Sequence, residues 1–196
     1  MRWSLAHFAA ALVFAGQCPA QRCGFDILKD DEVVGRIAAS RTVSGEHISY
    51  VMTSYSVLDL VWEQRVSTAM MAEYEGDSLR ACMSSVHVNG SVRDSSRMTP
   101  EPNGLRCYVH PRRNFQRTSG HPWTTARMYY EEPVGQSHIF VESVLEPCAL
   151  EASGPGTYQL TFPNGNKNRY VYRAGELQEV HVDRTFLDLV FRRSAD

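Results

Sequence analysis

The two side chains best placed for chemistry are His181 and Asp183, which stand two residues apart. Residues i and i+2 of a strand point to the same face, so this carboxylate could orient the imidazole, or the two could share a metal ion. Val180 and Val182 occupy the other face, and polar positions opposite an apolar face usually face solvent. The solvent-facing interpretation is therefore favoured. The sequence has no HExxH, HxH or CxxC spacing, so we predict no metal site and no cofactor.

Other signatures of catalysis are equally weak. No G-x-S-x-G motif occurs, and Gly154-Pro155-Gly156 precedes a strand pattern, whereas a phosphate-binding glycine loop opens a helix. Glu131 and Glu132 could resemble the carboxylate pair of a glycosidase, but adjacent residues of an extended chain point to opposite faces. We therefore predict no catalytic residue.

Aromatic and methionine side chains are the remaining candidates for binding. Five of them could line a concave apolar face: Trp62, Met70, Tyr158, Tyr170 and Tyr172. Concave sheet faces and barrel mouths are common binding places for small ligands. An ordinary hydrophobic core is the default interpretation of the same residues. The ligand hypothesis makes these five a site for an apolar or amphiphilic ligand.

Strands must position these residues, and most of the chain alternates apolar and polar residues with a period of two. The alternation continues on both sides of Pro163-Asn164-Gly165, which predicts a β-hairpin because Asn and Gly tolerate positive φ. Gly35 is expected at a bulge or a close approach of two backbones. Strands are predicted over residues 23–28, 33–43, 47–57, 62–74, 79–88, 91–98, 105–109 and 139–144, and in the hairpins of 156–191. Residues 123–130 are predicted as one short helix and residues 146–155 as a loop.

Two-residue and three-residue turns between these strands, such as Asn89-Gly90, predict antiparallel neighbours. A length of 196 residues and a hydrophobic content of 43% fit one domain with its own core. We predict a mainly β single domain over residues 21–196. Its long antiparallel meander should form a strongly curved sheet or a half-open barrel, with one short helix.

The first 20 residues are typical of a secretory signal peptide. Arg2 precedes an apolar run over residues 5–16, and small residues stand at the −3 and −1 positions of a cut after Ala20. A membrane anchor needs roughly 20 apolar residues, so this run is too short and no transmembrane span is expected. Gln17 argues against lipidation of Cys18, because the residue before a lipidated cysteine should be small. We predict a periplasmic or secreted protein that starts near Gln21.

The charge balance argues against nucleic acid as a partner. Loss of the leader would remove Arg2 and no acidic residue, which leaves 19 basic and 22 acidic side chains and a net charge of −3. Nucleic acids and anionic membrane surfaces attract a concentrated basic face. The short basic clusters at residues 110–113 and 192–193 are more typical of solvated surface. The expected partners are a lipid or other amphiphile, or a protein of the cell envelope.

Four cysteines would remain after cleavage: Cys23, Cys82, Cys107 and Cys148. An even number in an exported protein favours disulfides, in any of three connectivities. In a meander Cys82 and Cys107 would lie two strands apart, about 10 Å, which exceeds the limit of roughly 7 Å for a bridge. Cys23 or Cys148 is therefore the favoured partner of Cys82. The alternative is that one or more cysteines are buried thiols that pack as small apolar residues.

Several motifs resemble a bacterial exported family of unknown function. They are Tyr129-Tyr130-Glu131-Glu132-Pro133, Phe140-Val141-Glu142, Gly156-Thr157-Tyr158 with Leu160, the run over 163–172, Val34-Gly35 and the run over 182–185. On these motifs, which cover most of the mature chain, the chain is similar to domain-of-unknown-function family 6134. The resemblance implies export and a β-rich fold but no activity, and the four cysteines look additional to its pattern. More loosely, the meander resembles the half-barrel sheets of periplasmic lipoprotein carriers, whose concave faces hold acyl chains, although a fold does not fix a function.

Three functional classes follow from these features. The first is a non-catalytic binding module for an apolar or amphiphilic ligand, or for an envelope partner. The second is a structural or interaction protein of the cell envelope with no small-molecule site. An enzyme is the least favoured class, and it would gain if His181, Asp183 or Glu142 converged on a nucleophile or a metal.

Overall fold

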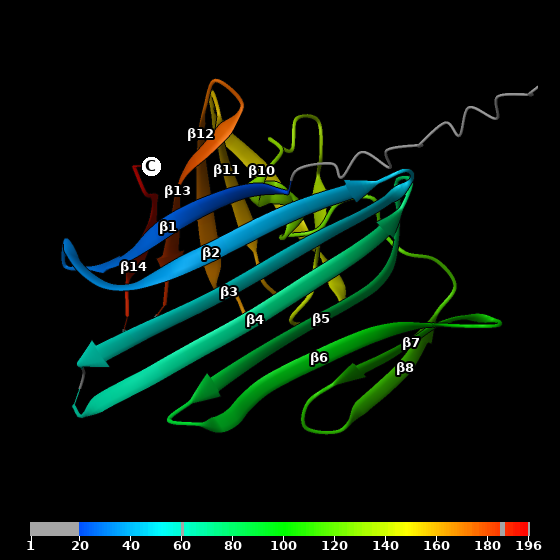
Figure 1. The fold of residues 1–196 in the computed structure, drawn as a ribbon, viewed down its shortest axis with the longest axis horizontal. Coiled ribbons are helices and arrows are strands. Elements are labelled where there is room, and N and C mark those ends of the chain that lie inside the picture. Colours follow the sequence, from blue (N-terminus) through cyan, green and yellow to red (C-terminus); the bar gives the residue numbers. More distant parts are fainter. Residues whose placement is uncertain (1–19, 60, 185–186, 196) are drawn as a thin grey trace, which may run out of the picture.

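The computed structural model describes residues 20–59, 61–184 and 187–195, so the predicted leader lies outside the described residues except for Ala20. The strands are β1 (Gln21–Lys29), β2 (Glu32–Ser44), β3 (His47–Asp59), β4 (Glu63–Glu75), β5 (Ser78–Val88), β6 (Ser91–Glu101), β7 (Gly104–Val109), β8 (Arg113–Arg117), β9 (His138–Val141), β10 (Glu146–Gly154), β11 (Thr157–Thr161), β12 (Lys167–Arg173), β13 (Glu176–Asp183) and β14 (Leu189–Arg193). They form one 14-stranded sheet in the order β8-β7-β6-β5-β4-β3-β2-β1-β14-β13-β12-β11-β10-β9. The sheet curls, so that the long strands β2–β6 cross the front of the view and β10–β13 stand steeply behind them (Figure 1). The predicted mainly β domain with a curved, half-open antiparallel sheet is confirmed.

Tight turns join the strands of the meander. At the β5–β6 turn Asn89 and Gly90 have φ values of 51° and 81°. A two-residue type I′ turn requires positive φ at both positions, and its twist matches that of the strands it joins. Ala174 and Gly175, with φ of 51° and 80°, make the same kind of turn between β12 and β13.

The predicted hairpin at Pro163-Asn164-Gly165 joins β11 to β12 through a different turn. The Gly165 N–H donates to the Phe162 carbonyl over 2.9 Å, and the Phe162 N–H donates to the Asn166 carbonyl over 2.9 Å. Gly165 has a φ of 85°, whereas Asn164 does not have a positive φ. This geometry is a type I turn with proline at its second position, followed by a glycine bulge.

Gly35 lies at both a bulge and a close approach, as predicted. The register between β1 and β2 shifts between Ile27 and Leu28, opposite Gly35. A Cβ atom on Gly35 would stand 2.5 Å from the Cβ of Ser56 and would also meet the carbonyl oxygen of Tyr55. The absence of a side chain therefore allows β3 to approach β2 this closely.

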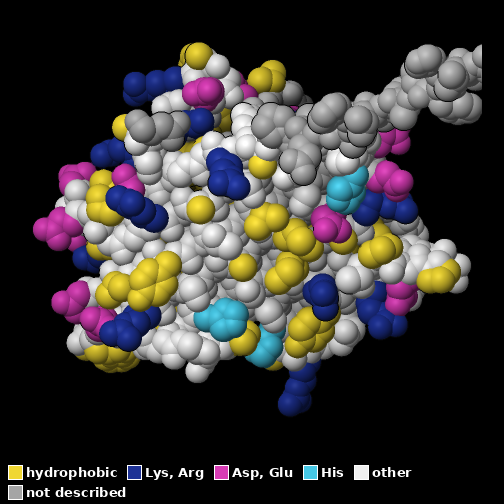
Figure 2. Space-filling model, in the orientation of Figure 1, with side chains coloured by type: hydrophobic (Ala, Val, Ile, Leu, Met, Phe, Trp, Pro, Cys, Tyr) yellow, Lys and Arg dark blue, Asp and Glu magenta, His cyan; other side chains and the backbone are white. Residues whose placement is uncertain are grey.

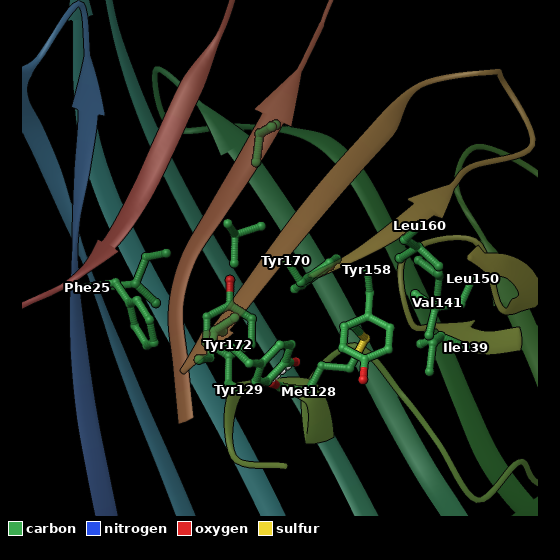
Figure 3. Close-up of a cluster of buried hydrophobic side chains, with 14 of the residues drawn as sticks. Phe25, Met128, Tyr129, Ile139, Val141, Leu150, Tyr158, Leu160, Tyr170 and Tyr172 are labelled. Carbon is green, nitrogen blue, oxygen red and sulfur yellow. Dashed lines mark hydrogen bonds between the residues drawn. The ribbon is translucent and has the colours of Figure 1, made fainter. Parts of the chain in front are cut away.

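Residues 118–137, here called the filling segment, connect β8 to β9 and lie on the concave face of the sheet. Met128 and Tyr129 of this segment belong to one buried cluster, which covers β1 and β9–β13. Ala126 belongs to a second cluster, which covers β3–β7. Figure 3 shows Met128 and Tyr129 next to Tyr158 and Tyr172 of the sheet. The protein's own chain thus forms the core against this part of the concave face.

The prediction of a loop over residues 146–155 is wrong, because these residues contain β10. Cys148 and Leu150 are buried and alternate with exposed Pro147 and Ala149. Proline lacks the N–H of a central strand, which hides this alternation. The strand β8 was not predicted either, since Phe115 is its one apolar residue.

The short helix predicted over residues 123–130 is a single 3-10 turn, η1 (Arg127–Tyr129). Thr124, Thr125 and Ala126, which precede it, are buried and bonded to the sheet and to Glu142, so these residues form a turn that is held by side-chain contacts and not the start of a longer helix. No helix within the described ranges is long and apolar enough to cross a membrane.

Candidate functional site

The structure separates the five predicted ligand-binding residues. Tyr158, Tyr170 and Tyr172 are buried in the same cluster as Met128. Met70 is half-buried and packs against the other cluster. Trp62 precedes β4 and is 63% exposed, outside both clusters. The three tyrosines are therefore core residues, whereas Met70 lies at the margin of a core cluster and Trp62 is exposed.

Tyrosine hydroxyl groups join the sheet to the filling segment. Tyr172 donates to the carbonyl of Met128 over 2.6 Å, and Tyr158 donates to the Glu132 carboxylate over 2.8 Å. The rings of Tyr158 and Tyr172 meet edge to face, with centroids 5.7 Å apart. A ligand could reach these tyrosines only after the filling segment had left the concave face.

Two more tyrosines, on strands β3 and β4, anchor the segment to the other half of the same concave face. Tyr50 donates to the Glu131 carboxylate over 3.0 Å, and Tyr74 donates to the hydroxyl of Thr124 over 2.9 Å. Desolvation raises the pKa of both Tyr50 and Tyr74. These phenols therefore stay protonated near neutral pH, so Tyr50 and Tyr74 remain hydrogen-bond donors.

Glu142 is the most deeply buried carboxyl group in the described part of the chain, with no exposed surface. It accepts a short hydrogen bond from the Thr125 hydroxyl and one of 2.9 Å from the Ala126 N–H. Its own carbonyl accepts a 2.5 Å hydrogen bond from Ser96 of β6. Burial raises the pKa of Glu142, and the hydrogen bonds from Thr125 and Ala126 oppose that effect. The group therefore ties the filling segment to the sheet and has no access to a substrate.

His181 and Asp183, the candidates for acid–base chemistry, lie on the outer surface, the solvent-facing position that the sequence favoured. His181 is half-buried and lies 3.0 Å from a carboxylate oxygen of Glu179, which also pairs with Arg192 over 2.9 Å. Asp183 is exposed at the end of β13. Glu142 lies in the core, so it does not converge with His181 and Asp183 in one pocket. Across the described residues no group of three or more His, Cys, Asp or Glu could hold a metal ion.

The cysteines form no disulfide in the structure, within the described residues. Cys82 and Cys107 both pair with Met98 of β6, which confirms that they lie two strands apart. Cys82, Cys107 and Cys148 are buried thiols, which is the alternative left open by the sequence, and Cys23 is half-buried beside Tyr130. Desolvation raises the pKa of Cys148 to about 11, so its thiolate is not available near neutral pH.

Sequence reasoning missed a row of valines on the concave face, which we call the valine strip: Val66, Val86 and Val88. Val66 pairs with Val88 across β4 and β5, and Val86 pairs with Thr68. Val66 and Thr68 alternate along β4 with Met70, whose sulfur accepts a 3.6 Å hydrogen bond from Thr125, so they share the inner face. The three valines are half-buried and belong to neither core cluster.

The polar groups beside the valine strip are already satisfied. Ser54 and Thr68, paired across β3 and β4, share a 2.7 Å hydrogen bond between their hydroxyls. The hydroxyls of Ser54 and Thr68 therefore have each other as partners, and the valine strip beside them offers an apolar surface. In the sequence these valines alternate with the polar residues Arg65, Ser67 and His87. Any strand with one buried face shows the same alternation, so the pattern does not distinguish a binding surface from a core.

Comparisons with known proteins place the fold. A family model described as "Domain of unknown function (DUF6134)" matches residues 25–194. Among solved structures, the chain is similar to a β-barrel-like protein of domain of unknown function DUF1849 from Brucella abortus, with a TM-score of 0.54 and 10% sequence identity. That match covers 90% of this chain and 95% of the other, and at this identity it shows the fold alone. A search of curated proteins finds no match.

Proposed function

We propose a binding function for this chain, which belongs to the domain-of-unknown-function family DUF6134, the family that its motifs resemble. In this proposal the protein is exported, is not an enzyme, and holds one apolar chain or amphiphile against the valine strip. The single observation that carries the proposal is that these inward-facing valines lie outside both cores of the protein. Inner-face positions of a curved sheet are normally filled by the protein or by a ligand.

The position of the strip fits a linear apolar ligand. The strip begins next to Met70, where the filling segment ends its contact with β4, and ends at Val88, directly before the β5–β6 turn. Trp62 lies at this same end of β4, since it precedes Val66 by four residues. Each methylene group removed from water would contribute about 0.8 kcal/mol to binding. Met70 and Trp62 thus remain in the proposed site, whereas Tyr158, Tyr170 and Tyr172 do not.

Native mass spectrometry of the purified protein with palmitate tests this function. Val86→Arg places a charge on the concave face, and Ser85→Arg places the same charge one residue away, on the outer face. We expect the wild type and Ser85→Arg to carry one palmitate and Val86→Arg to carry none. Equal binding by the two arginine variants would rule out the strip as the site.

Export is supported by the leader pattern of residues 1–20, and β1 begins at Gln21, directly after the proposed cut. N-terminal sequencing of protein expressed from the full chain in a Gram-negative host should give a sequence that starts at or near Gln21. An intact N-terminus in the cytoplasmic fraction would count against export.

A second function, an interaction protein of the envelope, is favoured by the outer face of β3–β5. Val51 and Tyr55 are 40% and 52% exposed there. The half-buried Met71 pairs with Val51, and the half-buried Met83 pairs with Met71, so the three form one row across the strands. Figure 2 shows hydrophobic side chains gathered near the middle of this face, with charged side chains mostly at its margins. A photo-crosslinker at Val51 that gave one discrete product in cells, together with no palmitate binding, would favour this function.

A further inference from the structure

The two edge strands of the sheet, β8 and β9, make no ladder with each other, and side chains bridge the seam between them. Arg113 of β8 forms a short ion pair with Glu146, at the start of β10. Arg117 donates to the carbonyl of Leu145 over 3.1 Å, and its guanidinium stands 5.3 Å from the ring centroid of Phe140. The seam is therefore closed by cationic side chains from β8.

Arg117, unlike Arg113, has no acidic partner among the described residues. It takes part in none of the ion pairs formed by the described residues, whereas Arg113 uses the one carboxylate at the seam. Its side chain is half-buried, where an unmatched charge costs more than it does in water. A guanidinium carries five N–H donors, and the bonds to Leu145 and His121 use only part of them.

The second basic group at the seam is His121. Its ring stacks on Phe140 with centroids 5.2 Å apart, and its Nε2 atom lies 3.3 Å from Nη2 of Arg117. Because Arg117 can only donate, this contact requires a neutral His121 whose Nε2 accepts. Burial, the charge of Arg117 and the charge of His138 all lower the pKa of His121. Within the described residues of β8, β9 and β10 the acidic side chains are Glu146, which pairs with Arg113, and Glu151, which is exposed and lies opposite Gln159 of β11, and neither offsets the lowering of the His121 pKa.

A depression of about 330 Å³ opens beside these two groups. It is lined by Phe115, Gln116, Arg117, Thr118, Ser119 and His121. Besides the guanidinium, the hydroxyl groups of Thr118 and Ser119 are donors suited to oxygen atoms of an anion, whereas the Gln116 amide already donates to the Glu101 carboxylate over 3.4 Å. Both hydroxyl-bearing residues are exposed, so the depression is open to solvent.

We propose that this depression at the β8–β9 seam is a binding site for a small oxyanion of the carboxylate or phosphate type, held by Arg117 with Thr118 and Ser119. The anion supplies the negative charge that Arg117 lacks. This site is separate from the valine strip and does not depend on amphiphile binding. Because the anion also faces His121, its binding favours the protonated imidazole, so affinity rises as the pH falls through the His121 pKa.

Inorganic phosphate and acetate, each titrated at constant ionic strength against chloride, test the proposal. The observable is the NMR signal of the His121 ring in the full-length protein, and the ring of His181, which pairs with Glu179, serves as an internal control. We expect a saturable shift of His121 alone and a rise in its pKa with at least one of the anions. Arg117→Gln should weaken binding by at least about tenfold, as expected for loss of a charge-assisted hydrogen bond. Arg112→Gln, an exposed arginine outside the depression, should bind as the wild type does.

A linear shift without saturation with both anions in the wild type overturns the proposal, and this readout does not depend on any variant folding. Equal affinity in Arg117→Gln and the wild type also overturns it. A palmitate result of either kind leaves this test unaffected, because the two sites share no residue.

Discussion

Tyrosine hydroxyls carry much of the specificity of this fold at the scale of single residues. The hydroxyl of Tyr172 is buried and donates to the main chain of the filling segment, at the Met128 carbonyl. Tyr108 offers a contrast, since its hydroxyl reaches the Pro111 carbonyl over 3.3 Å at an exposed site. A buried carbonyl that loses its donor costs free energy, whereas water replaces the donor at an exposed one.

Tyr172→Phe should therefore lower the free energy of unfolding by about 1–2 kcal/mol. Tyr108→Phe, the same chemical change at the exposed site, should alter it by less than about 0.5 kcal/mol. Urea unfolding followed by tryptophan fluorescence measures both. Equal losses in the two variants would mean that Tyr172 does not hold the filling segment in place.

Glu142 makes stability depend on pH. Burial raises its pKa in the folded protein, so the folded chain holds this proton more tightly than the unfolded chain does. The stabilising contribution is therefore fully present below the unfolded pKa of about 4.3 and is lost as the pH rises through the folded pKa. Glu142→Gln does not titrate and keeps the size of the side chain.

The free energy of unfolding of the wild type, relative to that of Glu142→Gln, should accordingly fall as the pH rises from 4 towards neutrality. Urea unfolding at a series of pH values gives this difference. A difference that stayed constant with pH would contradict the account of Glu142.

At the scale of elements, the strands with a strict period of two were predicted correctly. From 23–28 to 105–109 each predicted strand lies within an observed one or overlaps it closely, because one face of the sheet is buried and imposes the alternation. The strands β8 and β10 were not predicted, since they carry few apolar residues and β10 contains Pro147. Sequence periodicity reports burial on one face, so the signal is weakest where a strand such as β8 has one apolar residue or where a proline such as Pro147 interrupts the alternation.

The candidate site could be predicted only in part. Aromatic residues such as Tyr158 and Trp62 look alike in sequence, yet one is buried beneath the filling segment and the other is exposed. That difference depends on where residues 118–137 lie, and this segment has no period of two that would assign it to a face. Its position results from tertiary contacts, including the buried bonds of Glu142 with Thr125 and Ala126.

Gly35 is the position where the contact between β2 and β3 depends most directly on the residue type. A methyl group there would meet the Ser56 Cβ at 2.5 Å and the Tyr55 backbone. Gly35→Ala should therefore lower the free energy of unfolding by about 1–3 kcal/mol, since backbone must move to accept it. Gly154→Ala meets nothing within 4 Å and should leave stability unchanged or raise it by up to about 1 kcal/mol. Thermal and urea unfolding of the pair provide the test, and equal effects would contradict the close approach.

At the scale of the whole molecule, a single sheet of 14 strands encloses its own connecting segment. Part of the concave face is sealed by this segment, and the valine strip lies outside the two core clusters that it helps to form. The fold is similar to that of the Brucella abortus protein, although the two sequences are only 10% identical. This is consistent with a framework set by the alternation of apolar and polar residues and by the turns, while the residues of the inner surface differ between proteins. The inner surface is therefore the part of the molecule most directly connected with function in this account.

The central claim is that an apolar chain binds at Val66, Val86 and Val88. The most direct test is methyl NMR of the wild-type protein with labelled valines, titrated with palmitate below its critical aggregation concentration. The account predicts saturable shifts of these three methyl signals, with those of Val51, on the outer face, unchanged. Saturable shifts at Val51 with none at the valine strip, or no saturable shift at all, would contradict it.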